Sequence, residues 1–226
     1  MDCQLSHPLC AVRYRDGLSF GGSQMQSPDP GMVRCGCGVV AAQEVLLYLC
    51  RYHGGNGSAL FSEELLFGPA VSAESYNRSL DRIRAQYLPL IPHVGVNGIG
   101  LILGLNSAFR RCELPFSARW AISSGRFYPA MEEMLAQDIP VIFSVGPNFP
   151  VLWGRAKVGL RPDPEDRRTS AQAISAHYMI AVGLDAQNIH VSSWGRRFAV
   201  DRQEYDRYVK RFSSSIVSNL VSIRRK

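Results

Sequence analysis

The sequence predicts an α+β fold, with helices in the first part of the chain and an antiparallel sheet in the last part. The run from Gly38 to Tyr52 is apolar nearly all round and too long for a buried strand, which favours a core helix. Short apolar segments separated by turns fill about the last 50 residues, which is typical of strands. The 226 residues are 46% hydrophobic, so a buried core is expected. We therefore expect one domain over 1–226, with a helical lobe over about 1–138 and a sheet lobe over about 139–226.

The first part of the chain contains most of the predicted helices. Residues 1–36 carry many turn-forming Gly and Pro residues and are expected to be irregular. The core helix over 38–52 should end at the glycines that follow His53. Three more helices are predicted, over 72–87 with Ser72 or Ser75 as the cap, over 98–110 and over 127–137.

The second part of the chain contains the predicted strands. Residues 141–145 form a short apolar run after Pro140 and are predicted to be a buried strand. The polar segment over 154–172 is expected to be an exposed hairpin or loop. Further strands are predicted over 178–182, 188–193, 198–200 and 216–223, with a helix over 202–211 capped by Asp201.

Composition and charge argue against several classes of protein. The formal charge of +6 is compatible with an anionic partner, but no zinc, helix-turn-helix or stacking motif supports binding to nucleic acid. No apolar stretch approaches the roughly 20 residues that span a bilayer, so no membrane partner is expected. The first residues lack the pattern of a signal peptide, which favours a cytoplasmic location. The oligomeric state is left open.

Six cysteines are present, and in a reducing compartment we expect buried or catalytic thiols rather than disulfides. Cys35 and Cys37 are separated by one residue, and no second Cys/His pair has the spacing of a zinc site. The sequence therefore predicts neither a metal nor another cofactor.

Cys37 is the candidate nucleophile because it lies where the core helix begins. The amides and the dipole at a helix N-terminus favour a thiolate, the reactive form of cysteine. Gly36 and Gly38 remove side-chain bulk around this thiol and leave room for a substrate. Cys35, which also precedes a glycine, is the rival nucleophile or a partner thiol. A buried structural cysteine is the alternative interpretation.

His177 is the candidate base. It stands at the start of the first C-terminal strand, about 140 residues after Cys37. That order and separation are typical of papain-type enzymes, in which the base follows the nucleophile at a long distance. A core histidine with satisfied hydrogen bonds is the alternative.

Three sequence blocks together resemble the papain-like cysteine peptidases. They are Cys37 with its glycine at a helix start, His177 at the head of a strand that reaches Gly183, and the Ser-Ser-Trp-Gly run from Ser192 to Gly195. The chain is most similar to the bacterial branch that processes bacteriocin leaders, the double-glycine peptidases. That branch often has Gly-Ile-Pro-Val before a strand, which appears in this sequence as Asp-Ile-Pro-Val over 138–141.

The resemblance implies a papain-like fold and a Cys-His hydrolase of peptides or small amides. The family orients its histidine with Asn or Asp, and Ser192 occupies that motif position in this sequence. Ser192 is therefore expected to orient His177, with a backbone carbonyl as the alternative. Asp185 should be out of reach of His177, because eight strand residues span roughly 26 Å. Trp194 would shield the pair from water, or is a plain core tryptophan.

The resemblance also implies an oxyanion hole, made by the Cys37 amide and a glutamine that precedes it. Gln24 is favoured over Gln26, because the Gly-Gly-Ser run over 21–23 allows a tight turn before it. A solvated loop glutamine is the alternative.

Asn148 and Trp153 lie in or near a Gly-Pro-Asn-Phe-Pro loop and could touch substrate, as could Gly36; a packed surface turn is the alternative for the loop. The predicted function is a cysteine peptidase or amidase that works through an acyl-enzyme. Two other functions stay open. One is an inactive binding module on the same fold, which the serine in place of Asn or Asp favours, and the other is an acyltransferase.

Overall fold

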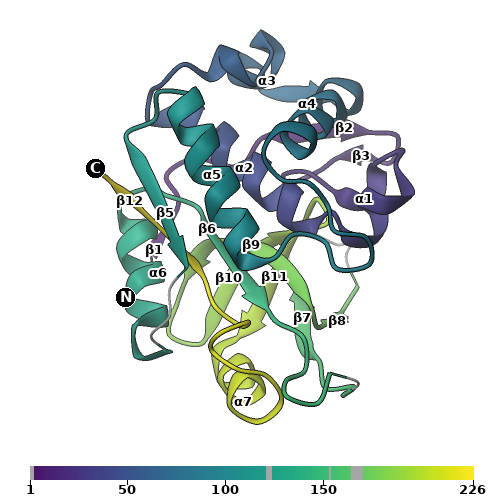
Figure 1. Ribbon diagram of the computed structural model, residues 1–226, viewed down its shortest axis with the longest axis vertical. Coiled ribbons are helices and arrows are strands. Elements are labelled where there is room, and N and C mark those ends of the chain that lie inside the picture. Colours follow the sequence, from purple (N-terminus) through teal and green to yellow (C-terminus); the bar gives the residue numbers. More distant parts are fainter. Residues whose placement is uncertain (1–2, 121–123, 153, 164–169) are drawn as a thin grey trace. The chain divides into compact units, whose positions relative to one another are not determined.

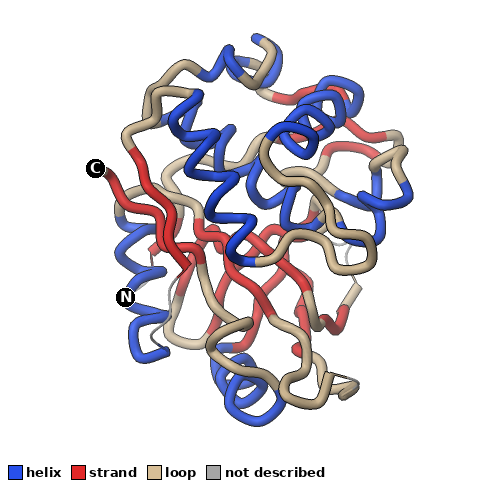
Figure 2. Tube along the Cα trace, in the orientation of Figure 1, coloured by secondary structure: helices blue, strands red, loops and turns tan. Residues whose placement is uncertain are grey.

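The computed structural model describes residues 3–120, 124–152, 154–163 and 170–226. Its helices and mainly antiparallel strands confirm the predicted α+β class (Figures 1 and 2). In the described part of the chain, no helix is both long enough and apolar enough to cross a bilayer.

The chain folds into two compact units, and each is described by itself. The helical unit comprises residues 7–119 and 223–226, and the sheet unit comprises residues 1–6 and 120–222. The sequence predicts a boundary near residue 138, whereas the units divide nearly 20 residues earlier, between 119 and 120. The helix over Phe127–Ala136 therefore belongs with the sheet.

The helical unit contains the predicted helices over 38–52, 72–87 and 98–110, which are confirmed to within one or two residues. Its helices are α1 (Pro30–Cys35), α2 (Cys37–Tyr52), α3 (Glu63–Phe67), α4 (Ala73–Gln86) and α5 (Gly98–Arg111), with short 3-10 helices η1 (Gln24–Gln26) and η2 (Gly57–Ala59).

Helix α2 is the core of the helical unit. Every residue from Gly38 to Cys50 is buried, and α2 contacts α3, α4 and α5. A helix that is apolar nearly all round is stable only when it is surrounded in this way. Two other helices of this unit begin with residues that favour a helix start. Pro30 is the first residue of α1, and Ser72 caps α4 by accepting a hydrogen bond from the Ser75 amide.

The expectation of irregular structure over 1–36 is wrong for several segments. The segment contains β1 (Cys3–Gln4), β2 (Ala11–Tyr14), β3 (Gly17–Leu18), η1 and α1. In the helical unit, β2 pairs antiparallel with β3 and parallel with β4 (Ala70–Ser72). The partner β4 lies far along the chain, so a local pattern of turn residues gives no indication of this pairing.

The sheet unit is built on a seven-stranded sheet. Its strands follow the order β1-β9-β10-β11-β7-β8, and β6 also pairs with β9. The remaining bounds are β6 (Val141–Val145), β7 (Val158–Pro162), β8 (Gln172–Ile174), β9 (His177–Leu184), β10 (Asn188–Ser193) and β11 (Arg196–Asp201), with helices η3 (Ser124–Arg126), α6 (Phe127–Ala136) and α7 (Arg202–Phe212).

Local signals predict most of this unit correctly. Asp201 caps α7, and its carboxylate accepts a hydrogen bond from the Glu204 amide at 2.9 Å. The polar segment over 154–172 contains β7 and the first residue of its partner strand β8, and its residues 164–169 lie outside the described part. Helix α6 contacts β1, β6 and β9, whereas α7 contacts β7 and β11.

The last predicted strand, over 216–223, begins later than expected. Residues around Ser214 form a turn instead, in which the Val217 and Ser218 amides donate to the Ser214 carbonyl. The strand is β12 (Val221–Arg225), which pairs with β5 (Phe116–Trp120).

Candidate functional site

His177 is the first residue of β9, where it pairs with Val145 of β6. It is 8% exposed, and this burial lowers the pKa of its imidazole from 6.5 to about 4. The preceding residue, Ala176, has a φ of 52°, which an L-residue with a side chain rarely adopts. The backbone is therefore strained where it delivers the imidazole to the sheet.

The hydroxyl of Ser193 is the hydrogen-bond partner of His177. Its Oγ lies 2.8 Å from the imidazole Nε2, and both side chains are buried. The sequence predicts Ser192 for this role, but neighbouring strand residues point to opposite faces of a sheet, and the structure places Ser193 on the face of His177. The pairing of β9 with β10 shifts register between His190 and Val191, which lie between the β9–β10 turn and Ser193.

Trp194 stacks on the imidazole of His177. The ring centroids are 4.7 Å apart and the planes are inclined by 26°. Trp194 has a φ of 51° and Gly195 a φ of 73°, as in the two-residue hairpin turns that join strands such as β10 and β11. A bulky residue is costly in this left-handed conformation. The turn thus stores strain at the residue that covers the imidazole.

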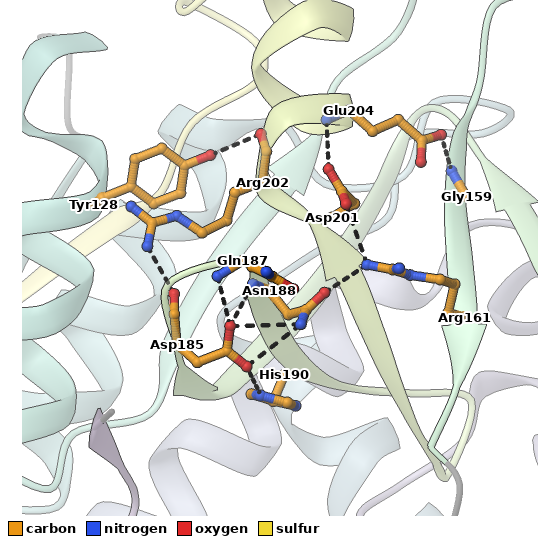
Figure 3. Close-up of polar contacts among 10 residues, drawn as sticks. All are labelled: Tyr128, Gly159, Arg161, Asp185, Gln187, Asn188, His190, Asp201, Arg202 and Glu204. Atoms are coloured by element: carbon orange, nitrogen blue, oxygen red, sulfur yellow. Dashed lines mark hydrogen bonds and ion pairs between the residues drawn. The ribbon is translucent and has the colours of Figure 1, made fainter. Parts of the chain in front are cut away.

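Asp185 belongs to a different cluster, the turn between β9 and β10 shown in Figure 3. Its carboxylate accepts hydrogen bonds from the Gln187 and Asn188 amides and, at 2.7 Å, from Nε2 of His190. Burial alone would raise its pKa, but these hydrogen bonds lower it to about 2. Asp185 therefore supports the turn and His190.

Cys37 is half-buried and is the first residue of α2, as predicted. Gly36 separates α1 from α2, and a Cβ at this position would lie 2.5 Å from the Met32 carbonyl oxygen. The absence of a side chain at Gly36 therefore allows its backbone, at the end of α1, to lie close to Met32. Cys35, the rival thiol, is the last residue of α1, and a negative charge is favoured at the start of a helix and disfavoured at its end.

Gln24 is buried and belongs to the same unit as Cys37. Its Nε2 donates to the Val33 carbonyl at 2.9 Å, in the helix that leads into Gly36 and Cys37. Gln26, the other glutamine that the sequence offers, is exposed. The structure thus places the Gln24 carboxamide against α1, while its role as an oxyanion donor stays a prediction.

Glu44 is a residue that sequence reasoning missed. It is 2% exposed, and its Oε1 accepts hydrogen bonds from the Gly22 amide at 2.9 Å and from the Tyr76 hydroxyl at 2.6 Å. The available signal was a carboxylate within the apolar run of the core helix. Its partners come from two other segments, which the sequence does not associate with it.

Asn148 is buried and has a structural partner. Its Nδ2 donates to the Ala156 carbonyl at 3.1 Å, and Gly154 lies against its side chain. These contacts hold the loop together, so the geometry gives no support to contact with a substrate. Trp153 lies outside the described residues.

Among the described residues, no cluster of three or more His, Cys, Asp or Glu side chains could hold a metal ion. No family model, curated protein or solved structure matches the chain. Any statement about function therefore rests on the residues and their geometry.

Proposed function

We propose that the protein is a papain-like cysteine peptidase or amidase with Cys37 as nucleophile and His177 as base. The observation that carries this proposal is the environment of His177. One ring nitrogen is bonded to Ser193, one ring face is covered by Trp194, and burial keeps the imidazole neutral at pH 7. A neutral, oriented imidazole is what a general base requires.

The proposed mechanism uses the two nitrogens of His177 differently. Nε2–H donates to Ser193, so Nδ1 carries the lone pair that accepts the Cys37 proton. The thiolate attacks the substrate carbonyl carbon, and the Cys37 amide and the Gln24 carboxamide stabilise the oxyanion. The imidazolium then protonates the leaving amine. Water hydrolyses the thioester and regenerates the thiol.

An inactive binding module is the second candidate. The observation that favours it is the uncharged partner of His177, because a seryl hydroxyl stabilises an imidazolium less than a carboxylate does. The low pKa of His177, about 4, also makes it a weak base. An acyltransferase remains a variant of the first proposal, in which an amine replaces water.

Competitive alkylation with iodoacetamide near pH 7, followed by peptide mapping, separates these candidates. We expect Cys37 to react at least about tenfold faster than each of the other five cysteines, because only a thiolate reacts readily. Cys37→Ala should abolish the fast phase, His177→Ala should slow it, and Cys35→Ala should leave it unchanged. If all six thiols react equally slowly, the hydrolase proposal is wrong and the binding module is favoured.

A further inference from the structure

The burial of the Glu44 carboxyl group costs free energy. Glu44 lies on α2 two helical turns after Cys37, and its side chain is almost completely buried. One carboxylate oxygen, Oε1, accepts two hydrogen bonds, whereas Oε2 has no hydrogen-bond partner among the described residues. An apolar side chain would avoid the cost of burying this group. The residue therefore calls for an explanation beyond packing.

The two hydrogen bonds of Glu44 end on the segment that leads to Gln24. Gly22 donates its amide directly, and the Tyr76 hydroxyl packs against the bare backbone of Gly22, where a Cβ would overlap it. The next amide, that of Ser23, donates to the Tyr14 hydroxyl at 3.1 Å. Both residues that immediately precede Gln24 are thus fixed by buried side chains.

We infer that Glu44 is a positioning residue, which holds the Gly22 backbone and thereby places the Gln24 carboxamide for oxyanion stabilisation. The inference rests on the proposed function, because it assigns Glu44 to the donor of that reaction. The Gln24 segment is held at two points: the carboxamide is held against α1 by Val33, and the backbone before it is held against α2 by Glu44. Preorganised donors stabilise an oxyanion more than mobile ones do.

The strength with which Glu44 holds the Gly22 backbone is expected to depend on pH. The titratable and charged groups around Glu44 are Tyr76 on α4, Tyr14 on β2, Cys10, and Arg51 on α2. Burial raises the pKa of Glu44 from 4.5 to about 7, against the opposing effects of its hydrogen bonds and of Arg51. The ionised carboxylate accepts stronger hydrogen bonds than the neutral acid, so the loop is held more firmly above pH 7.

Two reactions of the same thiol test the inference. Acylation by p-nitrophenyl acetate forms a Cys37 thioester, releases p-nitrophenolate and passes through an oxyanion. Alkylation by iodoacetamide displaces iodide from a saturated carbon and forms no oxyanion. A residue that acts through the oxyanion hole should therefore affect only the first reaction.

We expect Glu44→Ala to slow acylation about tenfold or more and to change alkylation less than about twofold. Glu44→Gln should slow acylation less than Glu44→Ala does. It should also remove the rise in acylation rate near pH 7. Tyr76→Phe removes only the hydroxyl and should also slow acylation selectively. The matched control is Glu64→Gln, which alters another carboxylate that holds backbone in the same unit and should leave both rates unchanged.

The inference is wrong if Glu44→Ala slows both reactions equally, which would indicate general damage, or slows neither. Amide hydrogen exchange at Gly22 and Ser23 provides a readout independent of catalysis and should accelerate in Glu44→Ala. If the wild-type protein shows no selective reaction of Cys37, the proposed function fails. If, in addition, exchange at Gly22 is faster in Glu44→Ala, Glu44 holds the Gly22 backbone for a structural reason only. That result would overturn the assignment of Glu44 to catalysis.

Discussion

Glu44 in the helical unit and His177 in the sheet unit are both buried titratable residues, and burial shifts their pKa values in opposite directions. In the helical unit, it raises the pKa of Glu44 to about 7. In the sheet unit, it lowers the pKa of His177 to about 4. Burial disfavours the charged form in both cases, so the carboxyl group of Glu44 becomes a weaker acid and the imidazole of His177 becomes a weaker base.

The comparison shows that the same physical cost can serve two purposes. His177 is neutral at pH 7 and so can accept a proton, which suits direct participation in catalysis. Glu44 is bonded to backbone and to a tyrosine hydroxyl, which suits the holding of a loop. A buried titratable group indicates a functional region, but its partners indicate what the group does.

The largest effect is expected when the imidazole of the sheet unit is removed. His177→Ala should reduce acyl transfer by about 10³-fold, because a general base contributes roughly two to four orders of magnitude. The release of p-nitrophenolate measures this loss. His190→Ala is the matched control, since His190 pairs with Asp185 in the same sheet. Equal losses in both variants would contradict the role of His177.

The next effect concerns stability and pH. Burying the ionised carboxylate of Glu44 costs more than its stronger hydrogen bonds recover, so its pKa is raised on folding. Its contribution to the stability of the folded state is therefore complete below about pH 4.5 and is lost as the pH rises through 7, a loss of about 3 kcal/mol. The lowered pKa of His177 means that stability present above pH 6.5 is lost as the pH falls through 4, by a similar amount.

Urea unfolding at a series of pH values checks both signs. The free energy of unfolding of Glu44→Gln, relative to the wild type, should increase as the pH rises from 4.5 to 7. That of His177→Gln, relative to the wild type, should increase as the pH falls from 6.5 to 4. Curves that run parallel to the wild type would show that these side chains are not titrating as the structure indicates.

A smaller effect is expected at the loop that Glu44 holds. Gly22→Ala introduces a Cβ that overlaps the Tyr76 hydroxyl, so we expect a loss of about 1–3 kcal/mol in the free energy of unfolding. Gly125→Ala has open space and should cost less than about 0.5 kcal/mol. Denaturant unfolding compares the two, and similar losses would argue against close packing at Gly22.

The smallest effect separates the two serines of β10. Ser193→Ala should reduce the rate of acylation about tenfold by releasing His177, whereas Ser192→Ala should change it less than about twofold. Ser193→Asp places a carboxylate beside the imidazole and should raise the pKa of His177, which NMR titration of the ring would detect. If Ser192→Ala is the more damaging substitution, the orienting hydroxyl has been assigned wrongly.

The elements that the sequence predicts well are those with local signals. The apolar run of α2 and the Asp201 cap of α7 each depend on adjacent residues, and both are confirmed. The short strand β2 was missed because its partner β4 lies nearly 60 residues later. Pairing over such a distance leaves no local pattern.

The residues of the candidate site also differ in whether local signals predict them. Local order predicts His177 at a strand start, but a register shift between β9 and β10 decides that Ser193 faces the imidazole. Glu44 is visible in the sequence as an acid in an apolar helix, yet its partner Gly22 is distant. Register and long-range partners therefore limit what the sequence can predict.

The division into units has a consequence for the order of folding during synthesis. Residues 223–226 belong to the helical unit, and the Lys226 amide donates to the Pro115 carbonyl, although residues 120–222 of the sheet unit are translated between them. A nascent chain that ends after residue 119 therefore lacks part of the helical unit. Ribosome-stalled chains of increasing length should acquire the full protease resistance of α2 only after residue 226 has left the exit tunnel.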